Sequence, residues 1–197
     1  MGSWQAILAA AGLAYLLGSI PFGLLLTRLA GLGDVRQIGS GNIGATNVLR
    51  TGNKGLAALT LLLDLAKGAA AVLIVARLFP GLQGLAALGV VLGHCFPVWL
   101  KFKGGKGVAT AAGVCFGIGW PVGLAYAVVW IGMLALTRIS SLSGMSAAIA
   151  APVAAYALGY QAEFPWLVAI SALVIWLHRA NIARLKNGTE PRVGSKK

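Results

Sequence analysis

The sequence predicts an all-α, polytopic integral membrane protein, a single domain over residues 1–197 that forms a helical bundle of seven transmembrane helices. Hydrophobic residues make up 58% of the chain and charged residues only 10%, and the mean hydropathy is +0.85. A soluble domain carries roughly 25% charged residues. The apolar residues form long continuous runs, which favour helices over the alternating strands of a membrane barrel.

The apolar runs give the predicted helices in order. The first run covers 4–30; after a polar loop at 31–54, the others cover 55–79, 82–100, 108–136, 142–160 and 164–177. The run at 108–136 is long for a single crossing, which needs about 20 residues. Because Gly117, Gly119 and Pro121 lie in its middle, we expect two short helices joined by a tight turn.

The basic residues select the same division. With seven crossings, the polar loop, the loop at 101–106, Arg138 and the basic tail at 178–197 share one face. Arg77 alone falls on the other face, and Lys67 lies within a helix. Cytoplasmic loops carry an excess of Lys and Arg. We therefore predict an N-terminus outside, a C-terminus in the cytoplasm, and any chemistry at the cytoplasmic face, where the three polar, glycine-rich segments gather.

The charge balance points to anionic partners. The chain has 16 Lys and Arg against 4 Asp and Glu. In a membrane protein this excess indicates topology first, then anionic lipid or an anionic substrate, and no nucleic acid. Cys95 and Cys115 lie in apolar runs without metal-ligand spacing, so we expect buried thiols.

The polar loop contains the first candidate site, at 39–50. Its glycines allow close approach of the backbone to a ligand, and Arg50 offers a bidentate fork for phosphate. Neutral hydrogen-bonding groups come from Ser40, Asn42, Thr46 and Asn47. If Thr46 or Asn47 opens a short helix, its N–H groups add donors for an anion. The alternative is a connecting loop of caps and turns.

The second candidate, at 93–110, lies between two apolar runs. Its cationic and flexible residues are Lys101, Lys103, Gly104, Gly105, Lys106 and Gly107. Lysines need water or anions, and adjacent glycines let backbone N–H groups turn toward a ligand. This loop is therefore a candidate anion cradle. The alternative is a basic turn that anchors two helices.

Two details refine this second segment. Pro97 is expected to kink the helix that carries His94 near its inner end. Leu100 and Gly107 stand where a P-loop requires glycine and Ser or Thr, so no bound nucleotide is implied.

The third candidate, at 178–190, follows the last apolar run. His178 and Asn181 share one helix face because they are three residues apart. We expect Asn187-Gly188 to end that helix, and Glu190 is the one acid in the tail. The alternative is a basic helix end that reaches the membrane surface.

Asp64 and Lys67 form a further feature inside the second apolar run. They are three residues apart, close enough to pair. Ionisable residues in a membrane helix are costly and usually face a polar interior, so both a functional and a structural pair are consistent with the sequence.

Several chemistries are excluded by absence. Two Asp and two Glu cannot build a multi-Asp metal site, and neither His94 nor His178 is followed by Asp at the spacing of the common acyltransferase motif. No serine lies in a nucleophile-elbow pattern. The remaining groups, rich in donors and poor in bases, suit a reaction between two phosphorylated substrates.

Taken together, these segments resemble the acyl-phosphate:glycerol-3-phosphate acyltransferase family, the bacterial PlsY type. The resemblance rests on 39–50, 93–107 and 178–190 in that order, with 64–68 as a further shared feature, and it covers essentially the whole chain. It implies an enzyme of the bacterial inner membrane that transfers a fatty acyl group from acyl phosphate to the 1-hydroxyl of glycerol 3-phosphate. The products are lysophosphatidic acid and phosphate, in the first acylation of phospholipid biosynthesis. It implies no metal, no other cofactor and no obligate protein partner.

The resemblance also suggests roles for the residues. The residues expected to bind the phosphates are Ser40, Asn42, Thr46, Asn47, Arg50, Lys101, Gly104, Gly105, Lys106 and Glu190. His178 and Asn181 are expected to orient the hydroxyl or stabilise the oxyanion, with His94, Asp64 and Lys67 in support. The proton goes to His178 or to a substrate phosphate, and the fatty chain lies between helices or in membrane lipid.

The main alternative function is a small organophosphate transporter, and a lipid-binding scaffold is a third. The chain shows no internal duplication, whereas many carriers are built from repeats. Its candidate ligand groups also gather at one surface rather than at mid-membrane, which favours the enzyme.

Overall fold

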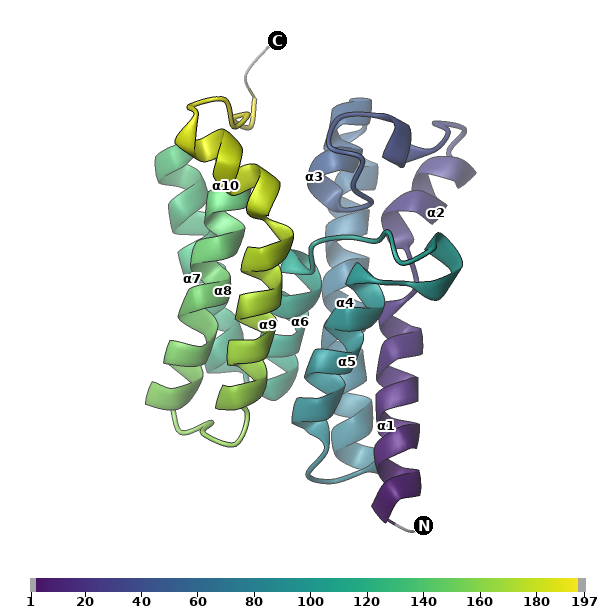
Figure 1. Ribbon diagram of the computed structural model, residues 1–197, viewed down its shortest axis with the longest axis vertical. Helices are drawn as coiled ribbons and strands as arrows, with labels where there is room; N and C mark the ends of the chain where they lie inside the picture. The colour runs from purple at the N-terminus through teal and green to yellow at the C-terminus, as the bar shows by residue number, and fades with distance from the viewer. Residues whose placement is uncertain (1–2, 195–197) are drawn as a thin grey trace.

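The computed structural model describes residues 3–194, and the regular elements in this range are all helices, without a strand (Figure 1). The N-terminal helices are α1 (Ser3–Gly18), α2 (Phe22–Leu29), η1 (Val35–Gln37), α3 (Ala45–Val48), η2 (Leu49–Thr51), α4 (Lys54–Leu78) and α5 (Gln83–Cys95). The C-terminal helices are η3 (Val98–Leu100), α6 (Val108–Ile118), α7 (Trp120–Thr137), α8 (Ser140–Ala157), α9 (Phe164–Leu177) and α10 (Arg179–Lys186). The all-α prediction is confirmed.

The predicted division of the run at 108–136 is also confirmed. Helix α6 ends at Ile118 and α7 begins at Trp120, so Gly119 alone forms the turn. Pro121 lies in the first turn of α7, where its missing N–H leaves no hydrogen bond unmade. The predicted end of the last helix at Asn187-Gly188 is confirmed as well, with Gly188 at φ +68°.

Two apolar runs differ from the prediction, both at a proline. The first run is two helices, because α1 ends at Gly18 and α2 begins only after Pro21. The expected kink at Pro97 is instead an end: α5 stops at Cys95 and the chain continues as η3. Proline disfavours helical geometry in the residue before it and donates no hydrogen bond.

The helix lengths support fewer crossings than the seven predicted. Within residues 3–194, four helical segments are long and apolar enough to cross a membrane: Ser3–Leu29, Lys54–Leu78, Gln83–Leu100 and Trp120–Thr137. The pair α9 and α10, bent by 57°, would make a fifth. Helix α6 has 11 residues, about 16 Å at 1.5 Å per residue, against a hydrocarbon core of about 30 Å.

Close helix crossings hold the bundle together. Figure 1 shows two groups, α1–α5 and α7–α10, with α6 between them and in contact with α4 and α7. At the α4–α6 crossing, a Cβ on Gly68 would overlap the Thr110 carbonyl, and one on Gly113 would overlap that of Leu65. Small residues of this kind let membrane helices approach closely.

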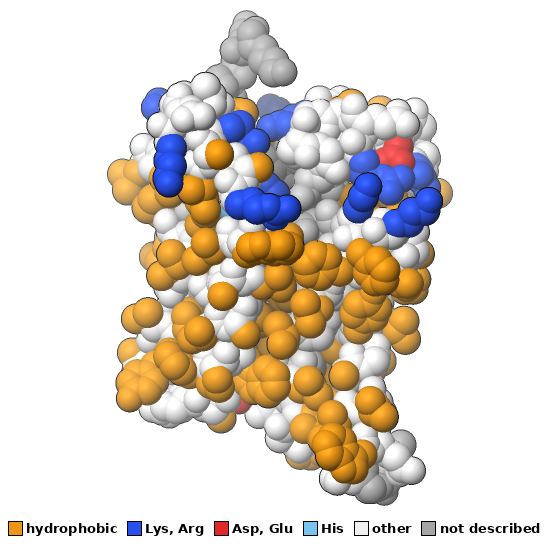
Figure 2. All heavy atoms as spheres, in the orientation of Figure 1, with side chains coloured by type: hydrophobic (Ala, Val, Ile, Leu, Met, Phe, Trp, Pro, Cys, Tyr) orange, Lys and Arg blue, Asp and Glu red, His pale blue; other side chains and the backbone are white. Residues whose placement is uncertain are grey.

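The surface divides along the long axis of the molecule. In Figure 2, Lys and Arg side chains gather at the end that carries α3 and α10, and hydrophobic side chains cover most of the face beyond it. Helix α1 begins at the opposite end (Figure 1). The polar segments predicted to share one face do lie together at the basic end.

Candidate functional site

The polar loop at 39–50 is organised by one buried amide. Asn47 is 2% exposed. Its Nδ2 donates to the carbonyls of Val35 (2.7 Å) and Asn42 (2.7 Å), and its Oδ1 accepts from Ser40 N (3.1 Å). The side chain of Asn47, a predicted phosphate ligand, is engaged with the loop backbone and shapes the loop.

The loop positions Arg50 and Thr46 next to other elements. Helix α3 begins at Ala45, so Thr46 lies in a short helix, as expected. Thr46 Oγ1 is 3.1 Å from Ser140 Oγ at the start of α8. The Arg50 side chain packs against Gly39, where a Cβ would overlap the guanidinium, and its charge acts on Lys106.

The loop between α5 and α6 lies directly on the end of α5. Gly104 N donates to Cys95 O and Gly105 N donates to His94 O, both at 3.0 Å. The expectation that these two N–H groups turn toward an anion is therefore wrong, because the α5 carbonyls, unpaired where Pro97 ends the helix, take them. Glycine is required here for close contact: a Cβ on Gly105 would overlap the His94 ring.

Beneath this loop lies a buried ionic cluster. Lys67 Nζ is 2.7 Å from Asp64 Oδ1, and it contacts Ile20 O at 2.8 Å and His94 Nδ1 at 3.0 Å. All three side chains are buried. The predicted Asp64–Lys67 pair is confirmed, and His94 belongs to it through Lys67.

A hydrogen-bond network joins the second and third segments. Lys106 Nζ donates to Asn181 Oδ1, and Asn181 Nδ2 donates to Glu190 Oε1 at 2.6 Å. The same carboxylate accepts from Ser141 Oγ at 2.5 Å and from Arg184 Nε at 2.7 Å. One acid thus gathers groups from α8, α10 and, through Asn181, the α5–α6 loop.

This network also sets the protonation of its members. Partial burial disfavours the charged carboxylate of Glu190, but hydrogen bonds from Ser141, Asn181 and Arg184 outweigh it and hold its pKa below the usual value. Glu190 is therefore ionised at neutral pH. Partial burial, helped by the charge of Arg184, lowers the pKa of Lys106.

His178 occupies the corner between α9 and α10. Its ring is 3% exposed, and Nδ1 donates to the Val174 carbonyl at 2.7 Å. Because a carbonyl can only accept, a neutral His178 has its hydrogen on Nδ1 and an unprotonated Nε2. The ring is near enough to feel the charges of Lys106 and Glu190.

A cavity of about 270 Å³ opens where the three segments meet. Its lining residues are Asn42, Cys95, Phe96, Phe102, Lys103, Gly104, Gly105, Lys106, Trp176, Leu177 and Arg179. The lining combines cations with apolar and aromatic side chains. Arg179 lies over the Trp176 ring at 4.6 Å, a distance typical of a cation–π contact.

Of the predicted site residues, Asn42, Gly104, Gly105 and Lys106 line this cavity, and the hydrogen-bond network brings Asn181 and Glu190 to Lys106. Lys101 is exposed and outside the lining. Lys103, named in the second candidate segment but not among the expected phosphate ligands, also lines the cavity. Sequence reasoning did not select Arg179, Arg184, Ser140 or Ser141. Ser140 and Ser141 could have been found from the sequence, because they are two adjacent hydroxyl residues that follow Arg138 at the start of an apolar run.

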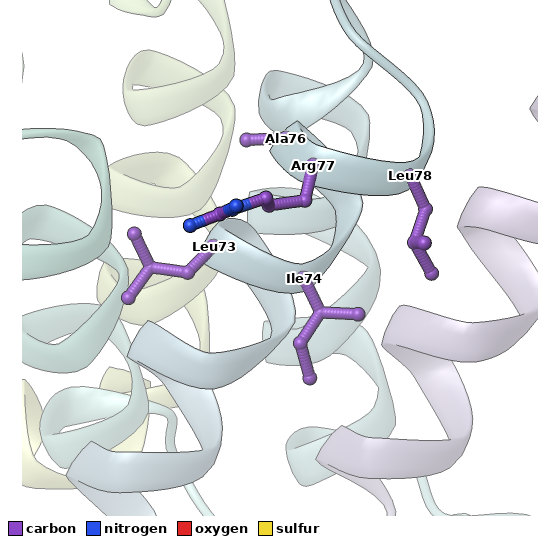
Figure 3. Close-up of a pocket in the computed structure, with 5 residues that line it drawn as sticks. All are labelled: Leu73, Ile74, Ala76, Arg77 and Leu78. Carbon is purple, nitrogen blue, oxygen red and sulfur yellow. The ribbon is translucent and has the colours of Figure 1, made fainter.

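A larger hollow of about 780 Å³ lies at the other end of α4, and its lining residues are Leu73, Ile74, Ala76, Arg77 and Leu78 (Figure 3). Arg77 is the one polar side chain among them. The hollow contains no cluster of polar or ionisable side chains, so its larger volume does not make it the better candidate for the functional site. Across residues 3–194, no group of three or more His, Cys, Asp or Glu is placed to hold a metal.

Comparisons with known proteins identify the family. The sequence profile of a family described as glycerol-3-phosphate acyltransferase matches residues 8–188. Glycerol-3-phosphate acyltransferase of Erythrobacter litoralis is 68% identical over 187 residues, which cover 95% of each chain. That of Novosphingobium aromaticivorans is 68% identical over 183 residues, which cover 93% of each.

Solved structures give the same result. The crystal structure of PlsY (YgiH), an integral membrane glycerol 3-phosphate acyltransferase, in its glycerol 3-phosphate form is similar at a TM-score of 0.90 and 42% identity, covering 95% of this chain and 96% of that one. The lysophosphatidic acid form of PlsY gives 0.88 and 41%, covering 95% of each chain.

The contact between Gly105 and His94 yields a test of the site geometry. Gly105→Ala should destabilise the protein by about 1–3 kcal/mol, because its Cβ overlaps the ring. The three atoms nearest to that Cβ all belong to the His94 side chain, so His94→Ala should remove most of the penalty. The measurement is the thermal unfolding midpoint in detergent, as a double-mutant cycle.

Gly104→Ala is the matched control. Its Cβ would overlap the His94 carbonyl and Pro97, which His94→Ala leaves in place. Equal coupling of His94→Ala to both glycine substitutions would contradict the geometry.

Proposed function

Because the chain belongs to the glycerol-3-phosphate acyltransferase family, we propose that it transfers a fatty acyl group from acyl phosphate to the 1-hydroxyl of glycerol 3-phosphate. The products are lysophosphatidic acid and phosphate, in the first acylation step of phospholipid biosynthesis. Family membership makes it an enzyme rather than a carrier. The PlsY structures with glycerol 3-phosphate and with lysophosphatidic acid support this substrate and product.

The observation that carries the proposal is the mixed lining of the cavity. Lys103, Lys106 and Arg179 supply positive charge to it. Phe96 and Trp176, whose ring centroids are 6.4 Å apart, form part of an apolar wall. An acyl phosphate has this same combination, a charged head on an apolar chain. The phosphate would contact the cations while the chain leaves along the apolar wall toward the lipid.

In the reaction, the 1-hydroxyl oxygen of glycerol 3-phosphate attacks the acyl carbonyl carbon. The bond between that carbon and the phosphate oxygen breaks, and inorganic phosphate leaves. Phosphate is a good leaving group, so the main task is to hold two anions together against their repulsion. Lys106, Arg50 and Arg179 serve this task, and Ser40, Asn42 and Thr46 add neutral donors.

The hydroxyl proton goes to a phosphate oxygen of a substrate. The cavity wall contains no carboxylate and no imidazole. His178 is buried and bonded to Val174, and Asn181 lies between Lys106 and Glu190. We assign to Asn181 the placement of Lys106, and to His178 the geometry of the corner between α9 and α10. Asn181 can also orient the hydroxyl.

The chain crosses the bacterial inner membrane seven times, with its C-terminus and active site on the cytoplasmic side. The basic end of the molecule supports this orientation. In this topology the 11-residue α6 would not span the full hydrocarbon core, so its inner end and the loop that carries Lys106 would be recessed below the surface. Such a recess would bring the phosphates close to the lipid-borne acyl chain.

The decisive assay uses the purified protein in detergent with acyl phosphate and glycerol 3-phosphate, with the lipid product separated by chromatography. Lys106→Ala should lower kcat/KM for both substrates on the order of 10²-fold, because a preorganised cation is lost. Lys186→Ala, which removes an exposed lysine of α10, should leave it unchanged. No product from the wild-type protein, or full activity of Lys106→Ala, would refute the assignment.

The proton route is tested by the pH profile of His178→Ala. We expect kcat to fall about tenfold through misplacement of Asn181, while the kcat–pH curve keeps its shape. Loss of one limb of the curve would instead identify His178 as the acid–base group.

Topology is tested by single cysteines. Trp120→Cys should react with a membrane-impermeant maleimide from outside, and Lys186→Cys only after permeabilisation. Both positions are exposed, and the native Cys95 and Cys115 are buried, so the background is low. A cytoplasmic position 120 would refute the proposed topology.

A further inference from the structure

Lys67 lies outside the cavity but contacts three separate parts of the fold. On α4 it pairs with Asp64, at the break between α1 and α2 it donates to the Ile20 carbonyl, and on α5 it contacts His94. Its side chain is 3% exposed. An ammonium group has three N–H donors, and these three partners account for its whole capacity.

The Asp64–Lys67 pair holds the His94 ring in place. Lys67 Nζ is 3.0 Å from His94 Nδ1, and Asp64 Oδ1 is 3.6 Å from the same ring atom. Nε2 is the ring atom nearest to the Cβ position of Gly105. The His94 carbonyl also accepts from Gly105 N. The loop therefore lies on both the ring and the backbone of His94.

Lys106 follows Gly105 directly, lines the cavity and bonds Asn181. We propose that Lys67 is a positioning residue for the acyl transfer: by fixing His94, it sets the place of Gly105 and so the direction of Lys106. The inference rests on the proposed function only in its effect on catalysis. Its effect on the loop is independent of that function.

The energetics favour positioning over stability as the reason for a charge here. A buried ion pair is often no more stabilising than apolar residues of similar volume, although removal of one partner alone is strongly destabilising. An apolar side chain at position 67 could fill the same space, but it could not bond both Ile20 O and His94 Nδ1. Directional bonds, rather than burial, distinguish lysine here.

The first test follows the loop itself by amide hydrogen exchange with mass spectrometry. The variant is Asp64→Leu combined with Lys67→Met, which removes both charges together and keeps the fold; Lys67→Met alone leaves Asp64 unpaired. Peptides covering 101–107 should exchange at least about tenfold faster, while α7 and α8 keep wild-type rates. Unchanged exchange at 101–107 would overturn the inference, whether or not the protein is an acyltransferase.

The second test is kinetic, with acyl phosphate and glycerol 3-phosphate. The double variant should lower kcat/KM on the order of 10²-fold, as expected for a displaced catalytic group. In a Lys106→Ala background the same double substitution should cost less than about threefold, because its effect passes through Lys106. A merely structural role predicts additive losses. Additive losses, or full activity of the double variant, would overturn the proposal.

Arg77→Met is the matched control, since it removes another basic residue of α4. Arg77 is exposed at the far end of that helix (Figure 3), and its removal should change neither exchange at 101–107 nor kcat/KM. An inactive wild-type protein would refute the proposed function while leaving the exchange result to decide the role of Lys67.

Discussion

The Glu190 carboxylate holds the basic end of the molecule together. It accepts hydrogen bonds from Ser141 on α8 and from Asn181 and Arg184 on α10, and Asn181 passes the connection on to Lys106. Without an acid at this point, the cations of the loop and of α10 would repel one another across the cavity. These hydrogen bonds favour the ionised form of Glu190 and hold its pKa below the usual value, although burial acts in the opposite direction. The second group of helices is thereby tied to the loop that leaves α5.

A second constraint comes from the prolines that end helices. Because Pro97 follows closely, α5 ends at Cys95. The carbonyls of His94 and Cys95 are therefore free to accept hydrogen bonds from the backbone N–H groups of Gly105 and Gly104. Pro21 interrupts the first apolar run between α1 and α2. Next to this break, the Ile20 carbonyl accepts a hydrogen bond from Lys67 Nζ. Both breaks therefore expose acceptors that the α5–α6 loop and its supporting lysine use. Fold and site are coupled at these two points.

Hydropathy predicted nearly every helix, because burial in lipid demands long apolar runs and glycine with proline marks their ends. The turn at Gly119 followed from the length of the run, the glycines and proline in its middle, and the distribution of basic residues. The break at Pro21 did not, since Ile20 and Phe22 keep the run apolar. The predicted topology was enough to show that the three polar segments lie at the same end of the bundle. It did not give the direction of single groups: whether the N–H of Gly105 faces an anion or a carbonyl depends on where α5 ends. That Asn47 shapes its loop likewise depends on tertiary contacts.

The scarcity of acids also bears on how the reaction is driven. Arg50, Arg184 and Arg179 all raise the cost of keeping Lys106 charged, and Glu190 offsets only part of it. Two phosphate groups entering the cavity would supply the missing negative charge, so binding relieves repulsion among the cations as well as forming hydrogen bonds. In the proposed reaction, charge would grow on the leaving oxygen as the acyl–phosphate bond breaks, and these fixed cations would stabilise it without reorganisation. An added carboxylate base would weaken that field, which is a physical reason for the proton to leave with phosphate.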